Sequence, residues 1–160
     1  WRKRSGAAVL LGVLSVSPTY VGTVGPSTSV VAAEDVRSRD LSYLEAVGIL
    51  SPDEELLYFY STGFLSIRGT GALASDLGVT SYWIDPVTEE LTVAFLSYGD
   101  IAHIETNPSS TWFEDTIVRL TNSEGGWFSF SLSAEDGGDV RFMDEVEHRI
   151  QAAAQQMITV

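Results

Sequence analysis

The sequence predicts a mainly-β fold, an antiparallel barrel or sandwich of about seven strands closed by a C-terminal helix, preceded by one transmembrane helix. Three observations support this prediction. Short apolar segments alternate with turns between residues 56 and 132, apolar residues recur at helical spacing from 139 to 157, and residues 5–33 carry no charge. The chain has 160 residues, enough for one domain with a buried core.

Composition excludes several classes of function. The chain has 22 acidic and nine basic residues, a net charge of −13, and no cysteine. Without cysteine there are no disulfides, thiolate zinc sites, iron–sulfur clusters or cysteine nucleophiles. The two histidines, His103 and His148, are too few for an all-histidine metal site. The acidic balance argues against nucleic acid, because phosphate binding needs clustered Lys and Arg.

The charge is unevenly distributed along the chain. Arg2, Lys3 and Arg4 lie at the amino end, whereas every acidic residue lies at or after Glu34. From residue 34 onward six arginines face 22 acidic residues, a net charge of −16. The chain therefore has a basic tip, an uncharged stretch and an acidic body.

Residues 1–24 are predicted to be the basic tip and a membrane anchor, with residues 6–24 spanning the bilayer. These 19 residues approach the roughly 20 that a helix needs to cross the hydrocarbon core. The positive-inside rule then keeps the amino terminus cytoplasmic and puts the acidic domain in the periplasm. The residues expected to form this anchor are Arg2, Lys3, Arg4, Val9, Leu10, Leu11, Val13, Leu14, Val16, Tyr20 and Val21.

Two other interpretations of this stretch remain open. A secretory signal peptide would share the basic start and the apolar run, with residues 31–33 as a cleavage site, although the run is long for one. A pair of buried strands in a soluble fold is also possible, because Val, Thr and Gly are poor helix formers. Residues 25–40 are small, polar and without clear periodicity, which indicates a linker.

The acidic body is expected to begin with a short helix over residues 40–47. Asp40 would be its N-cap, and Leu41, Leu44 and Val47 would share one face. The chain then changes to strand periodicity. Residues 56–60 and 64–67 flank a Ser-Thr-Gly turn, which predicts a hairpin.

Further strands are expected over 79–84, 91–96, around 101–104, 116–120 and 127–132, with turns at 85–90 and 122–126. In the last strand Trp127, Ser129 and Ser131 face one side, and the intervening Phe and Leu residues face the other. Strands at this spacing without intervening helices indicate an antiparallel sandwich or barrel.

The C-terminal segment is predicted to be an amphipathic helix over residues 139–157. Its apolar residues recur at helical spacing, so one face can cover an open end of the barrel and its strand edges. These residues are Phe142, Val146, Ile150, Ala153 and Met157.

Three segments resemble the bacterial pleckstrin-homology-like (PH-like) superfamily. They are residues 48–57 (GILSPDEELL), 69–79 (GTGALASDLGV) and 96–105 (LSYGDIAHIE), within a domain placed at residues 41–157. The resemblance implies a PH-like barrel acting as a protein-interaction or structural module without a cofactor. Lipid-binding members of the superfamily gather Lys and Arg in the loops joining the first strands. Here only Arg68 lies there, amid acidic residues, which disfavours phosphoinositide binding.

Few residues are candidates for a site. Trp112 and Phe113, in a loop with turn chemistry, form a candidate docking anchor, although one of them could instead plug the barrel. His103 could act as a general base, but no nucleophile motif accompanies it, which favours a structural or surface histidine. The acidic clusters at 53–55, 89–90 and 135–139 lack the ligand pattern of a calcium loop and are predicted to be solvated turns.

These features favour a non-enzymatic, membrane-anchored accessory or scaffold subunit. It would bind and stabilise a larger membrane complex, such as a bioenergetic or electron-transfer assembly, and its acidic body could attract a basic soluble protein. One alternative is a peripheral or secreted PH-like module that binds a peptide or lipid. A second is a carboxylate-based hydrolase, which needs two converging acids, one with a raised pKa. No catalytic residue, metal or cofactor is assigned.

Overall fold

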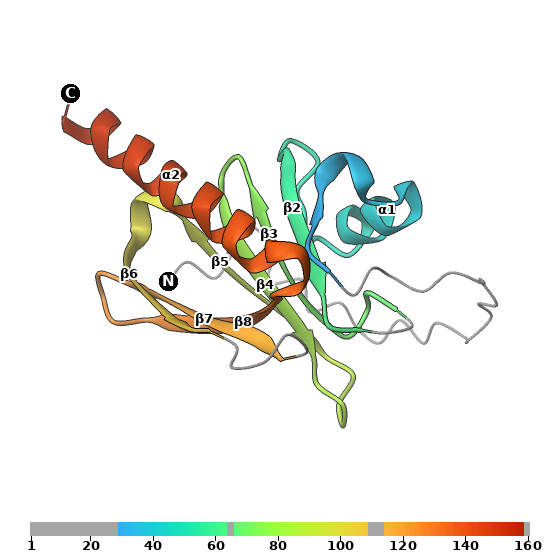
Figure 1. Ribbon diagram of the computed structural model, residues 1–160. Coiled ribbons are helices and arrows are strands. Elements are labelled where there is room, and N and C mark those ends of the chain that lie inside the picture. The colour runs from blue at the N-terminus through green and yellow to red at the C-terminus, as the bar shows by residue number, and fades with distance from the viewer. Residues whose placement is uncertain (1–28, 64–65, 109–113, 159–160) are drawn as a thin grey trace.

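Two antiparallel sheets and a long C-terminal helix form the fold in the computed structural model, which describes residues 29–63, 66–108 and 114–158 (Figure 1). One sheet has five strands in sequence order: β1 (Val31–Ala32), β2 (Leu56–Ser61), β3 (Thr70–Ser75), β4 (Gly78–Ile84) and β5 (Leu91–Ser97). The second has three: β6 (Ile101–Asn107), β7 (Asp115–Asn122) and β8 (Trp127–Ser133). The helices are α1 (Ser38–Ala46) and α2 (Gly138–Ile158), with short 3-10 turns η1 (Ala33–Asp35), η2 (Tyr98–Asp100) and η3 (Glu135–Gly137).

The five-stranded sheet is covered on both faces. Its inner face packs against the three-stranded sheet and α2, forming the larger core around Leu96, Leu120 and Phe142. Its outer face packs against α1 and the chain that follows, forming a second core around Leu44 and Tyr82. Figure 1 shows α2 lying across the sandwich and α1 beside β2. The mainly-β prediction with a closing helix is confirmed.

The first predicted hairpin is wrong in its second strand. β2 pairs with β3, which begins at Thr70, whereas the described part of the expected strand, residues 66–67, belongs to no strand. All residues of β3 after Thr70 are buried, because this strand lies between the two cores. A strand buried on both faces lacks the alternation by which a half-exposed strand is recognised.

The first helix begins two residues earlier than expected. Ser38 is its first residue and Arg37 is its N-cap, so Asp40 lies inside the first turn. The Arg37 Nε donates a hydrogen bond of 2.6 Å to the Asp40 carboxylate. Asp40 therefore pairs with a guanidinium and is not the N-cap that the sequence suggests.

Part of the stretch predicted as a linker, residues 25–40, packs into the domain. Val30 is 4% exposed and belongs to the larger core, and β1 pairs with β2. The folded domain therefore includes residues from Val30 onward and does not begin at residue 41. The sequence did not predict this packing, because the few apolar residues of residues 25–40 lie among Ser and Thr and show neither helix nor strand periodicity.

The closing helix buries one face along only part of its length. Phe142 and Val146 are fully buried, and Ile150 and Ala153 are partly buried against the larger core. Met157 is 66% exposed, which corrects its placement on the buried face. Figure 1 shows why, since the last turns of α2 extend past the sheets.

The predicted anchor, residues 6–24, lies outside the described residues. Among the helices of the described residues, none has the length and apolar composition needed to cross a bilayer.

Candidate functional site

The outer face of the three-stranded sheet carries two of the three large apolar side chains that are exposed on the described strands. Along β7 and β8, buried residues such as Leu120 and Phe128 alternate with residues that face outward. Trp127 is 50% exposed and Ile117 is 42% exposed. The sequence already placed Trp127 opposite the apolar side of β8, and this orientation is confirmed.

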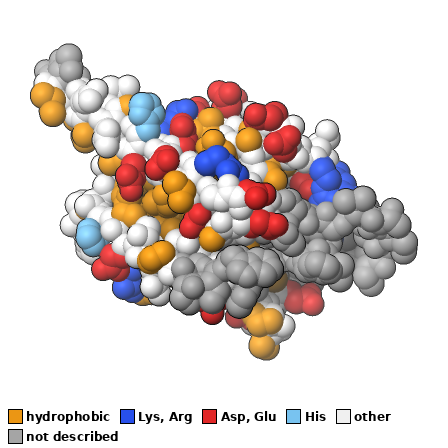
Figure 2. Space-filling model, viewed as in Figure 1, with side chains coloured by type: hydrophobic (Ala, Val, Ile, Leu, Met, Phe, Trp, Pro, Cys, Tyr) orange, Lys and Arg blue, Asp and Glu red, His pale blue; other side chains and the backbone are white. Residues whose placement is uncertain are grey.

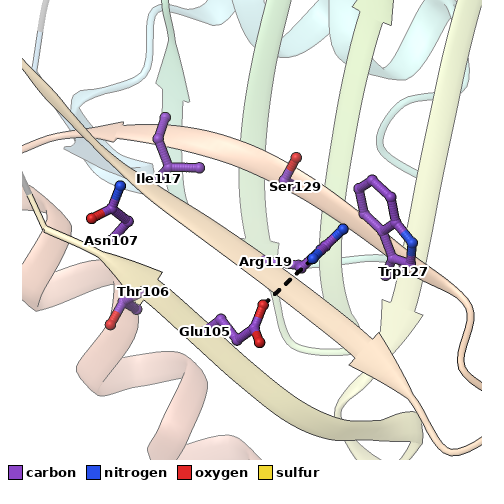
Figure 3. A pocket seen from close by; sticks show the side chains of 7 residues that line it. All are labelled: Glu105, Thr106, Asn107, Ile117, Arg119, Trp127 and Ser129. Carbon is purple, nitrogen blue, oxygen red and sulfur yellow. Dashed lines mark ion pairs between the residues drawn. The ribbon is translucent and has the colours of Figure 1, made fainter.

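Strand register brings three outward side chains into one row across this sheet. Glu105 on β6 lies opposite Arg119 on β7, and Arg119 lies opposite Ser129 on β8. The guanidinium carbon of Arg119 lies 3.7 Å from the centre of the Trp127 ring. Its Nη1 lies 3.6 Å from a carboxylate oxygen of Glu105. Figure 3 shows Arg119 between the carboxylate and the indole.

A shallow depression of about 340 Å³ lies on this face. It is open to solvent and presents one carboxylate, one guanidinium, hydroxyl and amide groups and two large apolar side chains (Figure 3). Its lining residues are Glu105, Thr106, Asn107, Ile117, Arg119, Trp127 and Ser129. These groups can form hydrogen bonds, an ion pair and apolar contacts with another molecule.

Of the candidate residues chosen from the sequence, the two histidines lie elsewhere. Trp112 and Phe113 lie outside the described residues. The His103 side chain is 65% exposed, with Nε2 3.7 Å from the Glu105 carboxylate, so it is a surface histidine. His148 is exposed on α2. Neither histidine lines the depression.

The prediction of solvated acidic turns is wrong for Glu54, which is 6% exposed. Its carboxylate accepts hydrogen bonds from the backbone N–H of Ser51 at 3.0 Å and from the hydroxyl of Ser75 at 2.6 Å. Glu54 thus fixes the loop before β2 to the end of β3. In the described ranges, no three acidic or histidine side chains are grouped as metal ligands would be.

Buried tyrosines also have structural roles. Burial raises the pKa of Tyr82, whose hydroxyl donates to the Ile67 carbonyl at 2.6 Å. Burial likewise raises the pKa of Tyr98, which donates to the Ser75 carbonyl. Burial, and then the hydrogen bond to Asp115, raise the pKa of Tyr60. Each hydroxyl stays protonated at neutral pH and ties a strand to a neighbouring segment.

On the face of the molecule in Figure 2, acidic side chains are more frequent than basic ones. The basic groups near them are engaged within the chain. Arg149, for example, donates from Nε to Glu145 at 2.7 Å along α2. The surface around the fold is therefore strongly negative, in agreement with the charge of the chain.

Comparison with known proteins identifies the fold. A pleckstrin homology domain from Shewanella amazonensis SB2B is similar, with 19% identity and a TM-score of 0.51 over 72% of this chain and 92% of that one. A DUF1696 family protein with a pleckstrin-homology domain from Shewanella loihica PV-4 has 17% identity and a TM-score of 0.48. That match covers 75% of this chain and 95% of the other. No family model and no curated protein matches the chain.

The protein therefore has a PH-like fold, as the resemblance in its sequence implied. The segments η1 and α1 cover the outer face of the five-stranded sheet, and β1 extends that sheet at the edge of β2.

Proposed function

We propose that this protein is a non-enzymatic, membrane-anchored accessory subunit that binds and stabilises a larger membrane complex through its PH-like domain. The observation that carries the proposal is the open face with Trp127 and Ile117 exposed beside a shallow depression. Large apolar side chains on an open face favour contact with another protein, whereas small-molecule sites enclose most of their ligand.

The chemistry of the depression supports binding over catalysis. A carboxylate-based hydrolase needs two converging acids, and among the described residues Glu105 is the one acid that lines this depression.

The small number of basic side chains on the domain argues against an anionic lipid as the ligand. Arg68, in the loop between β2 and β3, lies over the ring of Tyr43 at 5.2 Å from its centre. Phosphoinositide headgroups need several cations at one place. The acidic surface would repel such a headgroup, so the lipid-binding alternative is weaker than the protein-binding one.

The revised start of the domain constrains how the anchor would hold it. Because Val30 belongs to the core, only residues 25–29 separate the proposed span from the domain. Five residues reach roughly 17 Å when fully extended. The domain would then lie close to the periplasmic surface of the membrane, beside neighbouring subunits.

Membrane extraction of the full chain tests the proposal. The wild-type chain should stay with membranes through washes in high salt and in alkaline carbonate, and leave only in detergent. A matched variant, Leu11→Arg with Leu14→Arg, puts two charges into the apolar run, each costing roughly 3 kcal/mol of insertion. It should wash off. Release of the wild-type chain by salt alone would contradict the anchor and favour a peripheral or secreted binding module.

A further inference from the structure

We propose that the outer face of β6, β7 and β8 is the docking surface for a basic protein segment that also carries apolar side chains. This inference rests on the proposed function and names the surface and the chemistry of the partner. The surface is hereafter the β6–β8 face, and its central residues are Glu105, Ile117, Arg119 and Trp127.

The apolar part of the β6–β8 face supplies the contact area. Residues 117 and 121 are four apart on β7, and Trp127 pairs with Thr121, so Ile117 and Trp127 lie about 13 Å apart along the sheet. Arg119 and the depression lie between them (Figure 3). Outward residues of a solvated antiparallel sheet are usually polar, so two large apolar groups there indicate a surface that becomes covered.

Arg119 fixes the indole before any partner arrives. Its guanidinium stacks on the Trp127 ring and is paired on its other side with Glu105. Ordering a side chain on binding costs roughly 0.5–1.5 kcal/mol, and a ring already held in place avoids part of that cost. The Trp127 side chain remains half exposed despite this contact, so part of it is free to meet a partner.

The charge around the β6–β8 face selects the partner. Glu114 lies just before β7, at the Ile117 end, and Glu124 lies in the turn before Trp127; both are exposed. The charge of Arg119 is offset by Glu105, so the rim stays negative. The whole chain carries −13. A basic segment is attracted by this field, whereas an acidic partner is repelled.

The depression itself suits a side chain from a protein and not a free small molecule. Its volume of about 340 Å³ is at the low end for ligand sites, and it is open. Leu or Met side chains of the partner can rest against Ile117 at one end of the depression and against Trp127 at the other, while neighbouring Lys or Arg side chains meet Glu105 and Glu124.

Two fluorescein-labelled synthetic peptides of equal length test the inference, one with Lys and Leu separated by Gly and Ser, the other with Glu replacing Lys. The detergent-solubilised full chain should bind the basic peptide and not the acidic one in fluorescence anisotropy. Trp127→Ser should weaken binding at least about tenfold, as expected for a central aromatic contact. The matched control is Trp83→Ser on β4, which removes the other exposed tryptophan of the described residues, 37% exposed, and should leave affinity unchanged.

Amide chemical shifts locate the contact, and they should change mainly on β6, β7 and β8. Equal affinity of the Trp127 and Trp83 variants, shift changes spread over the whole acidic surface, or equal binding of the acidic peptide would overturn the inference. Both rings are partly buried, so each variant should lose some stability, and thermal unfolding should show that both stay folded at the temperature of the binding assay.

The docking inference can fail while the proposed function survives. If wild-type membranes yield a defined set of co-purifying subunits and Trp127→Ser yields the same set, another surface does the binding. If the wild type co-purifies with no subunit, the accessory role itself is wrong.

Discussion

Replacing Thr80 by valine should stabilise the protein. Thr80, on β4, is fully buried, and within the described residues its hydroxyl is the one buried side-chain polar group without a hydrogen-bond partner. Strand register places it between Leu73 on β3 and Phe95 on β5. An unpaired buried hydroxyl costs roughly 1–3 kcal/mol, because it loses its hydrogen bonds to water. Valine has nearly the same shape without that cost.

We expect Thr80→Val to raise the free energy of unfolding by about 1 kcal/mol. That corresponds to roughly 2–4 °C in Tm for a domain of this size. Urea unfolding followed by tryptophan fluorescence should show a higher midpoint with an unchanged m-value.

Thr116→Val is the matched control. Thr116 is also buried, at 4% exposed, but its hydroxyl donates to the Asp139 carboxylate at 2.6 Å. Hydrogen bonds to charged groups contribute roughly 1.5–3 kcal/mol, so this variant should lose about that much stability. If Thr80→Val loses stability as Thr116→Val does, the Thr80 hydroxyl has a partner and the reasoning is refuted.

Three further predictions concern packing and pH. Gly71→Ala should lower the free energy of unfolding in urea by roughly 1–3 kcal/mol, because an added Cβ would lie 2.7 Å from a backbone carbonyl oxygen of β2. Gly99→Ala, with open space around it, should leave that free energy unchanged, and equal effects of the two variants would contradict the packing. Phe142→Ala should lower the free energy of unfolding by roughly 3–5 kcal/mol, because Phe142 is fully buried. Val140→Ala, on the exposed side of α2, should change that free energy by less than about 0.5 kcal/mol. A similarly small effect of Phe142→Ala would mean that α2 is not part of the core. The free energy of unfolding should fall as pH rises above about 10, by roughly 1.4 kcal/mol per pH unit for each tyrosine that ionises only in the unfolded chain. A free energy of unfolding that stays constant from pH 10 to 11 would contradict the raised pKa values of Tyr60, Tyr82 and Tyr98.

The sign of the pH effect follows from the direction of those pKa shifts. Burial raises each folded-state pKa above the unfolded value near 10, so the folded protein holds its protons longer. The stabilisation is fully present below pH 10 and is lost as pH rises toward the folded-state pKa.

Elements with a clear periodicity were predictable from the sequence. The alternation from Trp127 to Leu132 gave both β8 and its outward face, and the spacing of Phe142 and Val146 gave the buried side of α2. The strand β3 was not found, because small residues buried on both faces show no alternation. The packing of Val30 was not found either, since it lies beside Gly138 of α2 and the other residues of its core are far along the chain.

The candidate site was predictable only in part. Alternation alone showed that Trp127 faces outward. That Arg119 covers its ring and pairs with Glu105 depends on the register between β6, β7 and β8, which the sequence does not specify. Outward-facing Ile and Trp on neighbouring predicted strands are the signal that could have pointed to this face.

Native purification of the full chain tests the central claim most directly. Membranes are washed with high salt, solubilised in mild detergent and fractionated, and the proteins that co-migrate with the chain are identified by mass spectrometry. The proposed accessory role predicts that the chain resists the wash and migrates with a defined, stoichiometric set of membrane subunits. A chain that washes off, or that migrates alone after cleavage near Ala33, would contradict it.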